Sequence, residues 1–352
     1  MKKRVLSIIF ILIMMFNCVY VSAEENDNEL KVYNENINFE ADKVLDGIGN
    51  ITIKQSIIIN GEKNNLYPTF DNPSDAIEKV STRAYDYLKL VAEQNSLTKL
   101  SKENWREYYS AIDNCSVTSN YVNDKYLMEV FFDIYKNEDS NEDIIHLLDS
   151  DENEKYEALA MMLPYDSPYC TEYFNNKNQV MEYIDFNIEA AINYANTYAV
   201  HANVAEYGEI QGKDCTNFAS QILENGGFNQ ISGTSVYSGW WHKKKNNKHT
   251  YSQSWTVADK FRRVLGISYS TKSHYEFSKK LKPGDFIAIS YNNGSSWSHI
   301  GFVTKVDNYV GDYGYYDYFV AQHSGNYLAW TSTEENDWEV QSGCTYGIIR
   351  YW

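Results

Sequence analysis

Apolar residues in the first part of the chain form short β-type runs followed by a helical stripe. After a polar, acidic stretch from residue 24 to about 45, which we expect to be a loose N-terminus, β-type runs at Val44–Ile48 and Ile51–Ile59 flank Gly49-Asn50. Asn60-Gly61 is typical of a turn. A helix capped by Ser74 is predicted from apolar residues at a three-to-four spacing: Ile77, Val80, Ala84, Leu88 and Val91.

The pattern then alternates between helices and strands. An imperfect alternation over Lys125–Lys136 predicts a strand, and Asn153–Leu163 predicts a helix that ends before Pro164. Small apolar residues from Ile188 to Ala199 predict a helix packed closely on another element. Four β-type runs follow: Phe286–Ser290, His299–Val306, Tyr318–His323 and Thr345–Tyr351. Helices followed by strands predict an α+β fold.

The first 23 residues have the pattern of a secretory signal peptide. Lys2-Lys3-Arg4 is a positive start, Val5–Phe16 is a short apolar run, and Val21-Ser22-Ala23 supplies small residues before a cleavage site after Ala23. No second run of about 18 apolar residues follows, so we expect no membrane span in the mature protein. We therefore expect it to be secreted, either extracellular or associated with the cell wall.

The charge and the cysteines narrow the possible functions. The chain of 352 residues has 31 basic and 48 acidic side chains and a net charge of −17, which disfavours binding to nucleic acid because that binding neutralises phosphate charge. Signal cleavage leaves four cysteines. Cys115, Cys170 and Cys344 are expected to be small buried residues, and the sequence leaves their disulfide state open.

The strongest chemical pattern begins at Lys213 and surrounds Cys215. Asp214 is a good helix cap and Gly226-Gly227 a good helix end, which places Cys215 in the first turn. There the unpaired backbone N–H groups and the helix dipole favour the thiolate, which is the nucleophilic form of cysteine. The same N–H groups can stabilise an oxyanion when a carbonyl is attacked.

A nucleophilic cysteine needs a base, and His299 is the candidate. It opens a β-type run in which Gly301 leaves room beside the ring. A third polar group should orient the imidazole. His323 at the end of the next strand is the first choice, with Asp317 and Asn326 as alternatives.

These motifs together resemble a known family. Over about residues 180–350 the chain is similar to the putative amidase domain of secreted Gram-positive bacterial proteins. The motifs that carry the resemblance are, in chain order, Asp214-Cys215-Thr216-Asn217-Phe218, the pair Trp240-Trp241, Lys282-Pro283-Gly284-Asp285, Ser298-His299-Ile300-Gly301-Phe302-Val303 and Ala321-Gln322-His323-Ser324. That domain is related to the NlpC-type and CHAP cell-wall peptidases. The resemblance implies a papain-like fold, with the cysteine helix packed on an antiparallel sheet. It also implies the nucleophile Cys215, the base His299 and the third member His323.

The resemblance completes the predicted organisation and function. We expect a signal peptide at 1–23, a smaller α+β accessory domain of unknown role at 24–175, and the papain-like amidase domain at 176–352. The predicted function is hydrolysis of a peptide amide bond by a cysteine hydrolase that needs no metal or organic cofactor, and the resemblance implies that this bond lies in cell-wall peptidoglycan. The sequence does not indicate the bond cleaved or the oligomeric state.

Several alternatives stay open. Trp240, Trp241 and Trp297 lie in loops around the predicted site, where they would bind substrate together with Asp214 or else pack in the core. A non-catalytic wall- or glycan-binding module using such an aromatic groove is the alternative function. One cysteine and two histidines would also suit zinc, although a fourth ligand is not evident.

Overall fold

The structure is a computed structural model, and it describes most of the chain after residue 32. The described residues are 33–36, 52–112, 115, 120–149, 155–177, 186–210, 213–233, 235–291, 294, 296–310, 312–333, 336, 338 and 344–350. The predicted signal peptide and the β-type run Val44–Ile48 lie outside them. Within these ranges, no helix combines the length and the hydropathy needed to cross a bilayer.

Helices and strands follow one another in a mixed order. The first part of the chain contains β1 (Tyr33–Asn36), β2 (Thr52–Ile59), β3 (Glu62–Asn65), β4 (Thr69–Phe70), α1 (Pro73–Arg83), α2 (Tyr85–Asn95), α3 (Trp105–Ile112), α4 (Val122–Leu148), α5 (Lys155–Met162) and α6 (Pro168–Lys177). The second part contains α7 (Ile188–Tyr198), α8 (Val204–Tyr207), α9 (Cys215–Asn225), β5 (His242–Lys245), β6 (Lys248–Tyr251), α10 (Gln253–Thr256), α11 (Ala258–Leu265), β7 (Tyr269–Thr271), α12 (His274–Ser278), β8 (Phe286–Ser290), β9 (His299–Val310), β10 (Tyr316–Gln322), β11 (Tyr327–Trp330) and β12 (Thr345–Ile349). The predicted α+β class is confirmed.

A six-stranded sheet is the scaffold of the second part. Its strand order is β11-β10-β9-β8-β12-β7, and each neighbouring pair is antiparallel. The four predicted strands of this region are present as β8, β9, β10 and β12. Pairing of Ala321 with Phe302 and of Val320 with Val303 fixes the register of β10 on β9. Facing residues of paired strands share one side of a sheet. This register therefore determines which polar side chains at the end of β10 lie on the same face as those at the start of β9.

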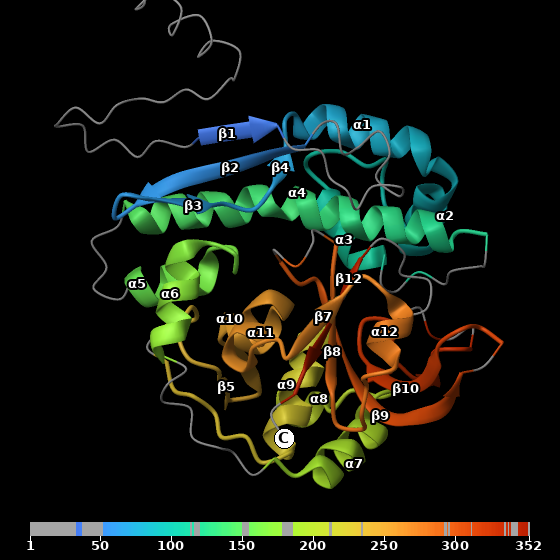
Figure 1. Cartoon of the computed structure of the whole chain (residues 1–352). Coiled ribbons are helices and arrows are strands. Elements are labelled where there is room, and N and C mark those ends of the chain that lie inside the picture. The colour runs from blue at the N-terminus through green and yellow to red at the C-terminus, as the bar shows by residue number, and fades with distance from the viewer. Residues whose placement is uncertain are drawn as a thin grey trace, which may run out of the picture. The chain divides into compact units, whose positions relative to one another are not determined.

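The two faces of this sheet bury different sets of residues. One face, which includes Phe286, Ile300 and Phe302, packs in one hydrophobic cluster with α7, α9, α10 and α11. The other face, which includes Ile287 and Val303, shares a second cluster with α12 and with helices of the first part. The cysteine helix α9 therefore lies directly on an antiparallel sheet (Figure 1).

The first part of the chain packs around the long helix α4. Figure 1 shows β2 and β3 running along α4, and the hydrophobic cluster that contains Ile57 and Ile144 joins β2 to this helix. The turn at Asn60-Gly61 is present, with φ angles of 52° and 83°. From Lys31 to Trp352 the chain forms one compact unit. The boundary predicted near residue 175 falls in the last turn of α6 and stays a prediction.

Three local predictions for the first part were wrong. Lys125–Lys136 lies in the helix α4, whose side chains here are buried on most sides, so its apolar residues lack clear helical spacing. The helix predicted from Ser74 begins at Pro73 and is capped by Asn72, whose side chain accepts from the N–H groups of Ser74 and Asp75. It also breaks at Ala84 into α1 and α2. The expected loose N-terminus contains β1, which pairs with β2.

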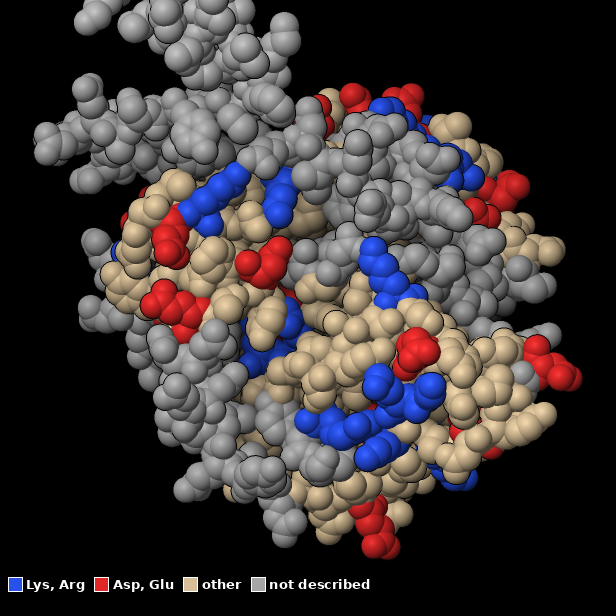
Figure 2. Space-filling model, viewed as in Figure 1, with Lys and Arg blue, Asp and Glu red and all other residues tan. Residues whose placement is uncertain are grey.

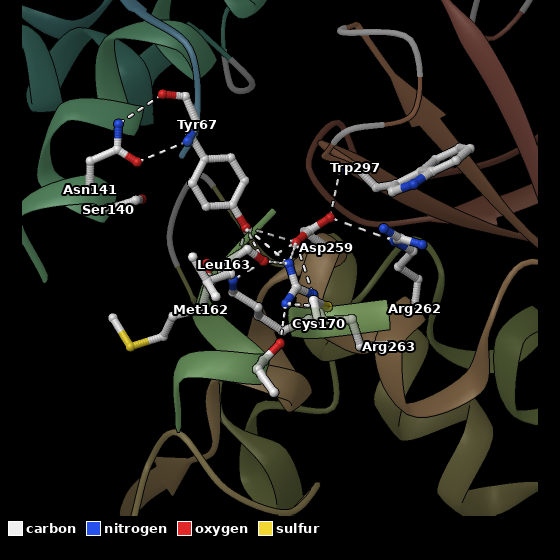
Figure 3. Close-up of polar contacts among 12 residues, drawn as sticks. Tyr67, Ser140, Asn141, Met162, Leu163, Cys170, Asp259, Arg262, Arg263 and Trp297 are labelled. Atoms are coloured by element: carbon white, nitrogen blue, oxygen red, sulfur yellow. Dashed lines mark hydrogen bonds and ion pairs between the residues drawn. The ribbon is translucent and has the colours of Figure 1, made fainter. Parts of the chain in front are cut away.

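A buried polar cluster joins the first part of the chain to the second (Figure 3). The Tyr67 hydroxyl donates to Asp259 Oδ2 at 3.0 Å and accepts from Lys260 Nζ at 3.0 Å, while Arg263 Nη2 lies 2.6 Å from Asp259 Oδ2. Arg263 and Lys260 also donate to carbonyl oxygens at the end of α5. Burial raises the pKa of Asp259, but the three cations Arg263, Arg262 and Lys260 around its carboxylate bring this pKa below its ordinary value. Asp259 therefore stays charged and holds both parts together.

Asp259 also reaches the loop that leads into the candidate base. Its second oxygen, Oδ1, accepts from the backbone N–H of Trp297 at 3.2 Å. Trp297 lies two residues before His299, so the cluster fixes the approach to β9.

Candidate active site

Cys215 opens α9, as predicted. The residues of α9 from Cys215 to Leu223 are all buried, and Gly226 ends the helix. Cys215 itself is only 5% exposed, and its Sγ lies 3.6 Å from Thr216 Oγ1. The thiol is thus held at the N-terminal end of a helix with a polar neighbour, a position that favours negative charge.

His299 opens β9 and acts directly on the thiol, which brings the two predicted catalytic side chains together. Burial raises the pKa of the Cys215 thiol. The charge and hydrogen bond of His299, together with Thr216 and Lys213, lower this pKa by more than burial raises it. The resulting pKa is about 7. A large share of the thiol is therefore ionised at neutral pH, and His299 stands beside it to exchange a proton.

Gln322, not His323, contacts the far side of the His299 ring. Its Oε1 lies 2.8 Å from His299 Nε2 and accepts from Trp338 Nε1 at 2.6 Å. Because the indole N–H of Trp338 can only donate, the oxygen of Gln322 must face both rings. His299 Nε2 then carries a proton and donates it to Gln322, which leaves Nδ1 as the basic atom.

His323 differs from its expected place beside His299. Its Nδ1 lies 2.5 Å from Asp214 Oδ2, its Nε2 lies 2.8 Å from the carbonyl oxygen of Tyr198, and its ring stacks on Phe218. The strand register explains the difference. Continued from the printed pairs, it places Gln322 opposite Gly301, on the face of His299, and turns His323 to the opposite face.

The other candidates for a third member, Asp317 and Asn326, have different surroundings. Asp317 is buried, and its carboxylate accepts from the hydroxyl groups of Thr331 and Ser332, both at 2.6 Å. Asn326 is exposed in the turn between β10 and β11. Gln322 was overlooked even though it lies in the recognised Ala-Gln-His-Ser motif. The amide next to the favoured histidine was the signal that would have found it.

Asp214 organises the loop before α9 rather than facing substrate. Its side chain is buried and makes no cap hydrogen bond to the helix backbone. Its Oδ1 instead accepts from the N–H of Ile210 and the amide of Asn217, both at 2.8 Å. Together with the contact to His323, these bonds fix the peptide that carries Cys215. The prediction of substrate binding by Asp214 therefore disagrees with its contacts, because both carboxylate oxygens already have partners within the protein.

The three tryptophans predicted around the site are core residues. Trp240 is fully buried, donates to Ser220 Oγ at 3.0 Å and stacks on Trp255. Trp241 and Trp297 are 7% and 5% exposed. The core-packing alternative thus describes the geometry of these three indoles, which are buried.

The remaining cysteines are buried, as predicted. Cys115, Cys170 and Cys344 are at most 5% exposed. The four cysteines of the described chain form no disulfide with one another. Within the same part of the chain, no group of three His, Cys, Asp or Glu side chains is arranged to hold a metal ion.

Comparison with known families supports the recognition made from the motifs. Residues 185–344 match the family model described as "Putative amidase domain". This segment is similar to the putative amidase domain family. The matched segment includes α9, β8, β9 and β10. It therefore contains Cys215, His299 and Gln322. This similarity supports a hydrolase that acts on amides.

Similarity to individual proteins is limited to part of the chain. The chain is 31% identical over 96 residues to the "Uncharacterized protein YhbB" of Bacillus subtilis (strain 168). The match covers 27% of this chain and 30% of that protein. No solved structure gives a significant match.

Proposed function

We propose that the protein is an exported cysteine amidase or peptidase that hydrolyses a peptide amide bond in cell-wall peptidoglycan. The observation that carries the proposal is the hydrogen bond between Cys215 and His299 at the start of a buried helix, with a thiol pKa of about 7. Export is inferred from the signal-peptide pattern of residues 1–23. The peptidoglycan substrate is inferred from the resemblance to cell-wall peptidases.

The chemistry is acyl transfer through the cysteine. The Cys215 thiolate attacks the amide carbonyl carbon, and the C–N bond breaks as the His299 imidazolium gives its Nδ1 proton to the leaving amine. Water then attacks the thioester, His299 Nδ1 takes a proton from it, and the carboxylic acid leaves as the sulfur returns to thiolate. Gln322 keeps the proton on Nε2 throughout, so that Nδ1 faces the reaction.

Backbone N–H groups at the start of α9 are the proposed oxyanion donors. The N–H of Cys215 donates to the Ser324 hydroxyl at 3.3 Å, a long contact that a charged oxygen would replace with a stronger one. Ser324 has a φ of 64°, in the left-handed region, and also accepts from the Asp214 N–H at 3.0 Å. We propose that this serine holds the position of the oxyanion before substrate arrives.

The arrangement of a cysteine helix on an antiparallel sheet that supplies the histidine supports a papain-like catalytic unit. The third position is taken by Gln322 in this proposal, in place of His323. A side-chain amide can accept from the imidazole N–H and fix its tautomer without bearing a charge.

Alkylation and wall digestion test the proposal. Iodoacetamide should modify Cys215 with a pH midpoint near 7, about one and a half units below an ordinary cysteine. Mature protein incubated with purified peptidoglycan should release fragments with new amine and carboxyl ends, identified by mass spectrometry. Both signals should vanish in Cys215→Ala, whereas Cys115→Ala, at a buried cysteine in a different hydrophobic cluster from α9, should retain them.

The contrary outcomes are specific. Fragment release that persists in folded Cys215→Ala would overturn cysteine chemistry. A thiol that titrates like an ordinary cysteine would mean that His299 does not activate it.

A further inference from the structure

Two lysines from different parts of the chain meet around one tyrosine beside the candidate nucleophile. Lys213 precedes Cys215 by two residues, and its Nζ lies 3.7 Å from the centre of the Tyr109 ring. Lys136, on α4, places its Nζ 6.0 Å from the same ring centre. Tyr109 lies on α3, so α3 and α4 contribute to the surroundings of the amidase site. All three side chains are half-buried.

Tyr109 is held in place as a neutral ring. Its hydroxyl donates to Asp133 Oδ1 at 2.6 Å. Burial and the nearby Asp133 carboxylate raise the pKa of Tyr109 well above its ordinary value, so the hydroxyl keeps its proton. A neutral aromatic face attracts ammonium groups without neutralising their charge.

The positive charge of the pair extends to Cys215. Lys213 lowers the pKa of the Cys215 thiol, and the Cys215 charge in turn acts on Lys136. Burial first, and Lys213 second, lower the pKa of Lys136, while Asp133, Cys215 and Asp139 oppose that shift. Asp139 itself pairs with Arg106 at 2.5 Å. The ammonium groups of Lys136 and Lys213 are half-buried and repel each other, so an anion bound between them would stabilise the charged form of both.

This local charge is opposite to that of the protein as a whole. The chain has a net charge of −17, and Figure 2 shows acidic side chains distributed over the viewed face with basic ones gathered in places. A pair of cations beside the nucleophile of an acidic protein would select among substrates by charge.

We propose that Lys136 and Lys213 form a subsite that binds a carboxylate of the substrate close to the scissile amide. The proposal rests on the proposed function and narrows its substrate class to acidic peptides. It also gives α3 and α4 a role, since Lys136 and Tyr109 complete a binding site whose nucleophile belongs to the amidase domain.

A pair of alkylating reagents that differ in charge tests the subsite without knowledge of the natural substrate. Iodoacetate carries a carboxylate and iodoacetamide a neutral amide, while both alkylate the same sulfur. The readout is the rate of alkylation of Cys215 by iodoacetate divided by the rate with iodoacetamide, measured by peptide mass spectrometry. This ratio cancels any change in the thiolate fraction, because both reagents need the thiolate. We expect this ratio to fall roughly five- to tenfold in Lys136→Met and in Lys213→Met, because each variant loses an ammonium partner for the carboxylate.

Controls separate a charge effect from a folding effect. Lys102→Met, at an exposed position before α3, should leave the ratio unchanged. The charge-conserving Lys136→Arg and Lys213→Arg should recover most of it. Raising the salt concentration should lower the wild-type ratio and affect the Met variants less, since salt screens the attraction.

The outcomes distinguish this inference from the proposed function. Equal ratios in wild type and both Met variants, with Cys215 still labelled, would overturn the carboxylate subsite and leave the cysteine hydrolase intact. Failure of both reagents to label Cys215 in folded wild-type protein would overturn the proposed nucleophile, and the subsite with it.

Discussion

Replacing Gln322 by leucine should separate the role of this amide from that of its neighbour His323. Leucine keeps the approximate size of glutamine but removes the oxygen that lies 2.8 Å from His299 Nε2 and 2.6 Å from Trp338 Nε1. His299 is partly exposed, so its N–H can turn to water, whereas Trp338 is fully buried. The change therefore leaves one buried donor unsatisfied and one catalytic ring without its support.

Two magnitudes follow from these contacts. An unsatisfied buried donor costs about 1–3 kcal/mol, so the free energy of unfolding should fall by about that amount. A hydrogen bond to a charged imidazolium contributes about 1.5–3 kcal/mol, and its loss should slow amide hydrolysis roughly ten- to a hundredfold. The same loss disfavours the thiolate–imidazolium pair. It should therefore raise the pH midpoint of Cys215 ionisation by about one to two pH units from its value near 7.

The assay is the rate of iodoacetamide modification of Cys215 from pH 5 to 10, with urea unfolding measured alongside. His323→Asn is the matched comparison: it loses contacts to Asp214 and to the Tyr198 carbonyl and should reduce stability with a smaller shift of the midpoint. A midpoint that moves in His323→Asn and stays in place in Gln322→Leu would refute the assignment of Gln322 and restore the sequence-based choice.

Two further substitutions test the framework around the site. Asp259→Asn should lower the free energy of unfolding by about 3–5 kcal/mol, because it leaves Arg263 and its neighbouring cations buried without their carboxylate. Asp139→Asn, in an exposed pair, should cost far less in the same urea titration, and equal losses would contradict the role of the buried cluster. Gly301→Ala should cost about 1–3 kcal/mol, since the new Cβ would lie 2.9 Å from the Trp338 ring. A thermal midpoint equal to wild type would show that the ring yields freely.

The strands and the cysteine helix could be predicted because their signals are local. The run Phe286–Ser290 is apolar throughout and follows a Pro-Gly turn, which is typical of a strand buried on both faces. The helix from Cys215 ends at two glycines. Helix α4 could not be recognised in the same way. Near Phe131 and Phe132 it is buried on most sides, so the periodic contrast between core and solvent disappears.

The candidate site was predictable only as far as chain order determines it. Cys215 at a helix start and His299 at a strand start are positions that a sequence pattern can show. The choice between Gln322 and His323 depends on the register of β10 on β9, and a shift by one residue exchanges the two faces. From residue type alone a histidine such as His323 is the expected third member, whereas the geometry favours the amide of Gln322 beside it.

This alternation gives adjacent residues of one motif separate tasks. Gln322 turns to the face of His299 and supports the ring that acts on the thiol, whereas His323 turns to the face of α9 and holds Asp214. Asp214 in turn fixes the peptide just before Cys215. One strand end thus positions the nucleophile from one side and the base from the other. A slip of β10 by one residue would misplace both together, so any substitution that alters this register should abolish thiol activation more completely than the loss of either side chain alone.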